Sequence, residues 1–300
     1  MKGTGKSIRE MLAEIELTED NHIAVMEALV ARSQVYLPST PSSLETGMKI
    51  YRARTHKKST DRFRTRRELS YHPDFQSVKL GRANLRKQPI FYGAVAAKEM
   101  SQPWAIANLE VSTFPPPKVQ TFTTSVWEVV KPIEIMPLVP LKKQAGRMEI
   151  AMELHTALWD QIAAVPEDHR ERTIELLTIL GEEFSKEVTD DKEYLLSAAF
   201  AHLIYSAGFG GIAYPSVRSD FRCFNVAIVP EVVNTHMKLV GAQVTQMQSI
   251  FCPKHRCHEL VTPHYELMRA ECDPPFQYVA APFDLAYHPH TGEYIPWREH

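Results

Sequence analysis

Side chains that could bind a ligand or catalyse a reaction lie in three separate segments whose other residues are mostly apolar. Arg52 lies in a predicted strand, Arg82 and Glu110 belong to the second segment, and Ser216 ends the third. A guanidinium binds oxyanions through paired hydrogen bonds, a carboxylate stabilises positive charge or moves a proton, and a hydroxyl both donates and accepts. The segments are residues 49–53 (KIYRA), 81–84 with 89–94 and 107–111 (GRAN, PIFYGA, ANLEV), and 211–216 (GIAYPS).

Two glycine-containing motifs resemble nucleotide-binding loops without meeting their requirements. Gly5-Lys6-Ser7 has the end of a P-loop, but that motif needs another glycine five residues earlier and a strand leading into it. The glycines at 208, 210 and 211 follow a predicted helix and precede a strand, the reverse of a dinucleotide fingerprint. We expect a turn there that accepts positive φ.

A cysteine and histidine cluster near the C-terminus invites a zinc assignment. Its spacings match no common zinc-finger pattern, and no second Cys-x-x-Cys completes a tetrahedron, although Cys272 or His264 could join. We therefore expect no metal, and a structural zinc ion is the alternative. The cluster consists of Cys252, His255, Cys257 and His258.

The stretch 52–67 is strongly basic, with nine Lys, Arg or His residues and one acid, Asp61. The favoured interpretation is an exposed, solvated loop. The alternative is a surface for an anionic ligand, either the phosphates of a nucleotide or an acidic partner.

The predicted order of the elements that position these groups indicates an α+β fold, with strands towards both ends and helices inserted between them. Apolar residues at three- and four-residue steps over 7–35 predict two short helices broken near 18–21, and a linker containing Pro38 and Pro41 follows. The predicted strands are 48–55, 89–94, at least two within 119–139, 212–214 and 225–229. The predicted helices are 101–112, 147–164, and 169–206 with a break at 188–191.

Composition limits the class of protein. The 300 residues are 44% hydrophobic, which is enough for a sizeable core, and the net charge of −2 argues against a nucleic-acid binder. The first twelve residues develop no apolar signal run, and no stretch of eighteen apolar residues occurs, so we expect a cytoplasmic protein without a membrane anchor. Four cysteines in a chain of this length predict reduced thiols.

The three segments together resemble the RES family, whose members look like ADP-ribosyltransferases in fold. Its opening Tyr-Arg is similar to Tyr51-Arg52, its Gly-Arg-x-Asn element to residues 81–84, and its Pro-x-x-Tyr-x-Ala strand to 89–94. The acid of its Ala-x-x-Glu helix matches Glu110, and its closing Gly-Ile-x-Tyr-Pro-Ser matches 211–216.

The resemblance implies an ADP-ribosyltransferase-like core of mixed or antiparallel strands, with an N-terminal helical extension and a helical insert. It covers about 48–230, apart from the insert. The implied organisation is an extension over 1–46, an NAD-binding domain over 47–235 with an insert at about 141–207, and a C-terminal segment, 236–300, packed on the same domain. The long basic stretch after Arg52 and the helical insert are departures from the family pattern.

The resemblance also implies roles for individual residues around NAD, which would be a substrate. Arg52 and Arg82 would meet its phosphates, and Tyr92, with Tyr51, would stack on the flat nicotinamide cation. Glu110 would stabilise the oxocarbenium-like transition state. Asn84 and Ser216 complete the implied binding set, and Ser216 would hold the ribose or the nicotinamide amide. The implied catalytic residues are Arg52, Glu110 and Ser216.

Three functions follow as hypotheses. The first is cleavage of the nicotinamide-ribose bond of NAD by hydrolysis or phosphorolysis, which the resemblance connects with the toxin of a toxin-antitoxin pair and therefore with an antitoxin partner. The second is transfer of ADP-ribose to a protein, because the donor site does not encode the acceptor. The third is a non-enzymatic module that binds metal or nucleic acid. The long helices could cover the cleft, pair subunits as a homo-oligomer, or meet an inhibitor.

Overall fold

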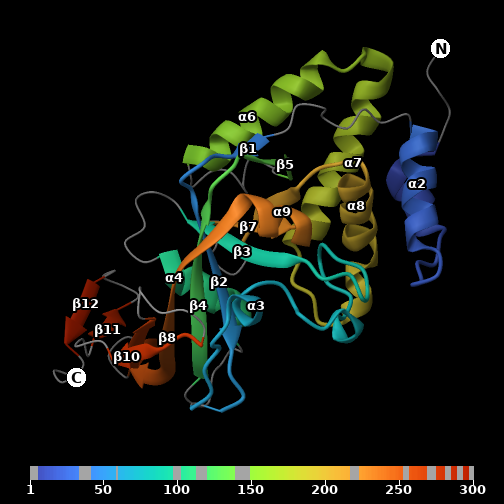
Figure 1. Cartoon of the computed structure of the whole chain (residues 1–300). Helices are drawn as coiled ribbons and strands as arrows, with labels where there is room; N and C mark the ends of the chain where they lie inside the picture. Colours follow the sequence, from blue (N-terminus) through green and yellow to red (C-terminus); the bar gives the residue numbers. More distant parts are fainter. Residues whose placement is uncertain are drawn as a thin grey trace.

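The computed structural model describes residues 6–33, 42–58, 60–96, 103–112, 120–138, 149–216, 223–252, 257–268, 275–280, 285–288 and 293–296. Within this part of the chain the fold is a twelve-stranded mixed sheet with helices on both faces (Figure 1). The strands are β1 (Ser42–Leu44), β2 (Lys49–Thr55), β3 (Phe91–Ala96), β4 (Gln120–Val129), β5 (Ile133–Pro137), β6 (Gly211–Pro215), β7 (Cys223–Ile228), β8 (Met237–Cys252), β9 (Cys257–Met268), β10 (Tyr278–Ala280), β11 (Leu285–His288) and β12 (Glu293–Pro296).

Most of the long helices of the described chain lie in two places along the sequence. The helical insert follows β5, and the two N-terminal helices precede β1. The helices are α1 (Ile8–Ala13), α2 (His22–Ser33), α3 (Arg66–Leu69), η1 (Phe75–Ser77), α4 (Pro103–Val111), α6 (Glu149–Ala164), α7 (Glu167–Ser185), η2 (Asp191–Tyr194), α8 (Leu195–Ser206) and α9 (Pro230–His236).

The strand order is β1-β5-β6-β7-β3-β2-β4-β8-β9-β11-β12, with β10 paired to β9. Among the described pairings β5–β6 is parallel, and the others are antiparallel. Some consecutive strands are separated in the sheet, since β5, β6 and β7 lie between β1 and β3. The α+β class is correct, and the strands after 236 continue the same sheet.

Two apolar cores hold the layers together, one on each face of the sheet. On one face Met26 of α2, Phe200 of α8 and Ile212 of β6 belong to one buried cluster. On the other face Leu69 of α3 and Val233 of α9 pack in a second cluster with the sheet, whose largest buried side chain there is Trp127. Figure 1 shows α2, α7 and α8 side by side over the first face.

The predicted breaks and turns agree well with the structure where it describes them. The two N-terminal helices are separated at residues 14–21, and Ser7 and Glu10 form a capping box at the start of α1. Gly208 has φ +96° in the turn between α8 and β6, as expected for a glycine there. The linker prolines and Ser101 lie outside the described residues. No described helix is both long and apolar enough to cross a bilayer.

The prediction of a solvated loop fits only part of the described basic stretch, because residues 57, 58, 60, 61, 64 and 67 are exposed while several arginines bind other elements. Arg62 forms a two-pronged ion pair with Glu266 of β9 at 2.8 and 2.7 Å, with both side chains mostly buried. Arg54 donates to the carbonyl of Glu68, and Arg64 donates to that of Phe276 at 3.2 Å. These arginines hold α3 and the C-terminal strands against the sheet.

Candidate active site

A row of side chains crosses four neighbouring strands on one face of the sheet. Tyr214 of β6 lies opposite Asn225 of β7, Asn225 opposite Ala94 of β3, and Ala94 opposite Tyr51 of β2. Residues directly opposite in antiparallel strands project from the same face, so this row forms a continuous floor. Helix α4 packs over β2 and β3 and brings Glu110 to this face.

Two adjoining cavities open over this floor. One has a volume of about 330 Å³ and is lined by Tyr51 and Arg52, and the other has a volume of about 770 Å³ and is lined by Arg82. Cavities of these sizes are typical of small-molecule sites. Both are also lined by the same four residues, Tyr92, Glu110, Tyr214 and Asn225, so they form one continuous cleft.

Glu110 and Ser216 contact each other directly. The Ser216 hydroxyl donates a short hydrogen bond to Oε1 of Glu110, across 106 residues of sequence. Ser216 is 0% exposed, and its backbone amide donates to the carbonyl of Cys223 at 3.0 Å. Because Ser216 is fully buried while Glu110 lines both cavities, the serine orients the carboxylate towards the cleft.

Arg52 bridges the two strands that border the smaller cavity. Among the described residues β2 and β3 have one pair of opposed residues, Tyr51 and Ala94, and Arg52 reaches over to β3 with a 2.6 Å bond from Nη1 to the carbonyl of Tyr92. Its Nε donates to the carbonyl of Ser70 at 3.0 Å.

The environment of Arg52 limits what else it can bind. Its guanidinium stacks over the Phe91 ring at 5.2 Å, and burial, with a smaller effect from the charge of Arg54, lowers its pKa to about 9. Phe91 and Ser70 lie on the second face of the sheet, so the guanidinium is directed away from the floor that Tyr51 and Ala94 form. Arg52 is still among the residues that line the smaller cavity.

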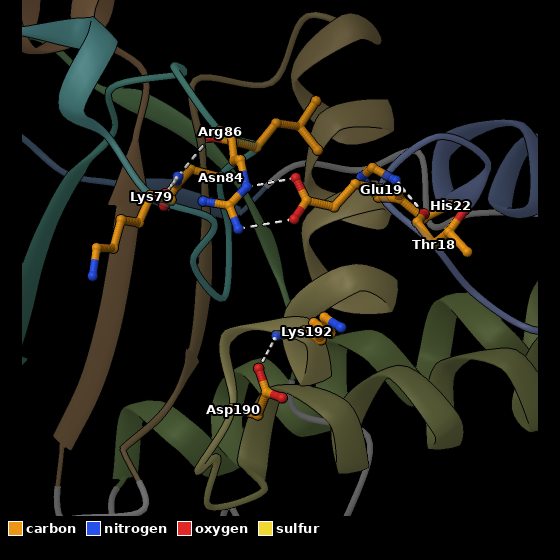
Figure 2. A network of polar contacts seen from close by, with 9 residues as sticks. Thr18, Glu19, His22, Lys79, Asn84, Arg86, Asp190 and Lys192 are labelled. Atoms are coloured by element: carbon orange, nitrogen blue, oxygen red, sulfur yellow. Dashed lines mark hydrogen bonds and ion pairs between the residues drawn. The ribbon is translucent and has the colours of Figure 1, made fainter.

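Tyr92 is held in place by the 81–84 loop. Its hydroxyl accepts from the amide of Ala83 at 2.9 Å and donates to Oδ1 of Asn84 at 2.8 Å, and burial raises its pKa. The Asn84 amide group donates to the carbonyls of Lys79 and Leu85, both at 2.7 Å, and Figure 2 draws Asn84 beside Lys79. Asn84 is 4% exposed, lines neither cavity and supports Tyr92, and its expected role in binding a ligand stays a prediction.

Arg82, expected to meet a phosphate, also binds the end of a helix. Nη1 and Nη2 donate to the carbonyls of Glu183 and Lys186, both at 2.8 Å, and the guanidinium lies over the Tyr194 ring. These carbonyls belong to the end of α7, where backbone acceptors lack helical partners. Arg82 lines the larger cavity while one N–H of each terminal nitrogen holds the helical insert, and its other N–H donors are not used by these two bonds.

Tyr214 and Asn225 are cleft residues that sequence reasoning did not assign. Tyr214 is within the closing motif, so that motif was the available signal, and its burial raises its pKa. Asn225 enters through strand register, which is a tertiary property. The insert adds residues 186–189 and Tyr194 to the wall of the larger cavity, and no local signal indicated that role.

No group of three potential metal ligands comes together among the side chains that the structure describes. Cys252 and Cys257 are opposite each other in backbone register at the end of the β8–β9 hairpin, and the side chains of the cysteine and histidine cluster lie outside the described part, so the zinc alternative stays untested.

Comparisons with known proteins add little. The sequence matches no protein-family profile and no curated protein. One similar solved structure is a chain of the M. tuberculosis MbcT-MbcA toxin-antitoxin complex, with 12% identity and a TM-score of 0.30, covering 75% of this chain and 92% of that chain. At that TM-score the likeness assigns neither an activity nor a detailed fold.

Proposed function

We propose that this chain is a RES-like enzyme that binds NAD and cleaves its nicotinamide-ribose bond. The observation that supports this most strongly is the convergence of the three sequence segments on one cleft. Arg52 and Glu110 line the same cavity, and Ser216 bonds to Glu110. These residues lie on three different elements or their ends, and only folding brings them together.

The arrangement suits a reaction that develops positive charge on ribose. The bond between C1′ and the ring nitrogen breaks, and its electron pair leaves with nicotinamide. The Glu110 carboxylate then faces a cationic sugar, which it stabilises more strongly than the ground state. An acceptor oxygen forms the new bond to C1′ and passes its proton to the Glu110 carboxylate or to solvent.

The ring-binding part of the proposal rests on two tyrosines. Tyr51 and Tyr92 both line the smaller cavity, and the hydroxyl of Tyr92 is fixed by two hydrogen bonds. A fixed aromatic ring can stack on a flat cation at little cost in side-chain entropy. Phosphate binding is proposed for Arg82, which lines the larger cavity and keeps N–H donors beyond the two that bind the end of α7.

The molecule that accepts the ADP-ribose group determines which reaction this site would catalyse. Water gives hydrolysis, inorganic phosphate gives phosphorolysis, and a protein side chain gives ADP-ribosylation. We propose hydrolysis or phosphorolysis, in keeping with the growth-arresting toxins of the RES family, with an antitoxin as partner. Adding labelled NAD and the purified protein to a cell lysate tests the third acceptor. Transfer to a protein side chain would give a labelled protein band, and hydrolysis or phosphorolysis would not.

The deciding experiment measures nicotinamide release from NAD, with and without phosphate, by wild type, Glu110→Gln and Ser216→Ala. We expect Glu110→Gln to lower kcat on the order of 10²- to 10³-fold, because it loses the stabilising charge. Ser216→Ala should lower kcat by about tenfold or more with a smaller effect on KM, because the carboxylate loses its orientation.

Glu128→Gln is the matched control, since Glu128 is an acid of β4 that pairs with Lys49 and lines neither cavity. Each variant is checked for folding by circular dichroism. Full turnover by a folded Glu110→Gln would remove that residue from the mechanism, and absence of nicotinamide release by wild type under every condition would refute the proposal.

A further inference from the structure

A separate cavity lies on the face of the sheet opposite Glu110, between α3 and α9. Arg66 at this cavity stacks over the ring of Trp127, which belongs to the buried cluster of that second face. The cavity has a volume of about 500 Å³. Its lining consists of Arg66, Arg67, Ser70, Tyr71, Pro73 and Asn234.

The lining is rich in hydrogen-bond donors, and none of these six residues is acidic. Arg66 uses Nη2 in long contacts of 3.3 and 3.5 Å to the carbonyls of Val233 and Met237. Arg67 uses Nη2 in a 3.3 Å contact to the carbonyl of Pro73. Each guanidinium has five N–H donors, so both retain capacity for a ligand. Two adjacent cations without an acid among the lining residues favour an anion.

Ser70 provides an independent indication of a ligand. It is 4% exposed, and its hydroxyl makes no hydrogen bond to the described residues. A buried hydroxyl without a partner is unfavourable, and an oxygen of a bound anion would satisfy it. The backbone of Ser70 is held by the 3.0 Å bond that its carbonyl accepts from Arg52.

The other wall is also fixed before any ligand binds. Asn234 of α9 donates to the hydroxyl of Tyr71 at 3.0 Å, which joins α9 to the segment after α3. Because the backbone and the tyrosine are already positioned, a ligand would lose little free energy in ordering them.

We propose that this cavity binds the phosphoryl group of a phosphate monoester about the size of a sugar phosphate. Guanidinium groups bind phosphate oxygens through paired, charge-assisted hydrogen bonds. The volume exceeds that needed by a phosphate alone and falls within the range of small-molecule pockets. The site lies on the opposite face of the sheet from Glu110, and its ligand would bind the arginines of the basic stretch whose donors other contacts leave available.

Calorimetric titration of the full chain with ribose 5-phosphate tests the proposal. Saturable binding is expected, with no binding of unphosphorylated ribose. Arg67→Gln should weaken binding by about tenfold or more, as removal of a charged hydrogen-bond donor does. Lys131→Gln removes the same charge at an exposed residue outside this cavity and should leave the affinity unchanged.

Ser70→Ala is the second variant, because it deletes a hydroxyl that has no described partner. It should weaken ribose 5-phosphate binding while leaving the thermal midpoint of the free protein unchanged or raised. Glu110→Gln should bind with wild-type affinity. Absence of saturable binding, equal weakening by Lys131→Gln, or loss of binding in Glu110→Gln but not in Arg67→Gln would overturn the assignment.

Discussion

At the scale of single residues, several polar groups stabilise the fold through partners far away in sequence. His56 is the clearest titrating example. Its Nε2 contacts the hydroxyl of Thr123 at 2.6 Å, its ring stacks on Phe63 with centroids 4.5 Å apart, and the side chain is partly buried. Burial, followed by the charge of Arg62, lowers its pKa to about 4.

This depressed pKa predicts a loss of stability in mild acid. Between pH 6.5 and pH 4 the unfolded chain protonates His56 while the folded chain does not, so the free energy of unfolding falls as pH falls through that window. After discounting for partial exposure, the contribution from pH 7 to pH 5 is about 1 kcal/mol. Urea denaturation at both pH values should show a pH dependence flatter by this amount in His56→Gln. Identical pH dependence in the two proteins would contradict the assignment.

At the scale of elements, the helical insert is attached to the cleft through the end of α7. Arg82 donates to two carbonyls there, and the 81–84 loop that carries it also fixes Tyr92. A charged donor near a helix C-terminus stabilises both the free carbonyls and the helix dipole. The insert is therefore part of the cleft wall and not a separate appendage.

Arg82→Gln should destabilise the chain by about 2 kcal/mol, since two charge-assisted bonds to half-buried carbonyls are lost. Thermal or urea unfolding measures the change. Arg86→Gln is the control four residues later, where an exposed guanidinium pairs with Glu19 and a smaller effect is expected. Equal effects of the two substitutions would indicate that Arg82 does not anchor α7.

At the scale of the whole molecule, the N-terminal helices belong to the main core. Met26 is 0% exposed and lies in one cluster with Phe200. Figure 2 shows a polar contact that ties the same region to the 81–88 segment, where Arg86 bonds both carboxylate oxygens of Glu19 at 2.5 and 2.8 Å and lowers the pKa of that acid.

Met26→Ala should therefore cost about 2–5 kcal/mol in the free energy of unfolding, through lost burial and the cavity left behind. Glu27→Ala alters the neighbouring exposed position of the same helix and should stay within about 0.5 kcal/mol of wild type. Chemical denaturation followed by circular dichroism compares the two. A cost below about 1 kcal/mol for Met26→Ala would mean that α2 packs only loosely on the insert.

Local elements could be predicted from the sequence because their signals lie within a few neighbouring residues. The break between α1 and α2, the strand around Arg52 and the interruption before η2 all follow from apolar periodicity and turn residues. The pairing of β8 with β4 and β9 could not be predicted, since strand order depends on contacts between residues far apart in sequence.

The sequence by itself determined the α+β class and the three segments whose polar residues are candidates for one site. Only the tertiary structure decided how their donors are used. Ser216 is buried against Glu110, Asn84 supports Tyr92, and Arg82 binds the end of α7. Residue type sets which hydrogen bonds a side chain can make, but packing decides which partners come within reach, and that information is distributed over the whole chain.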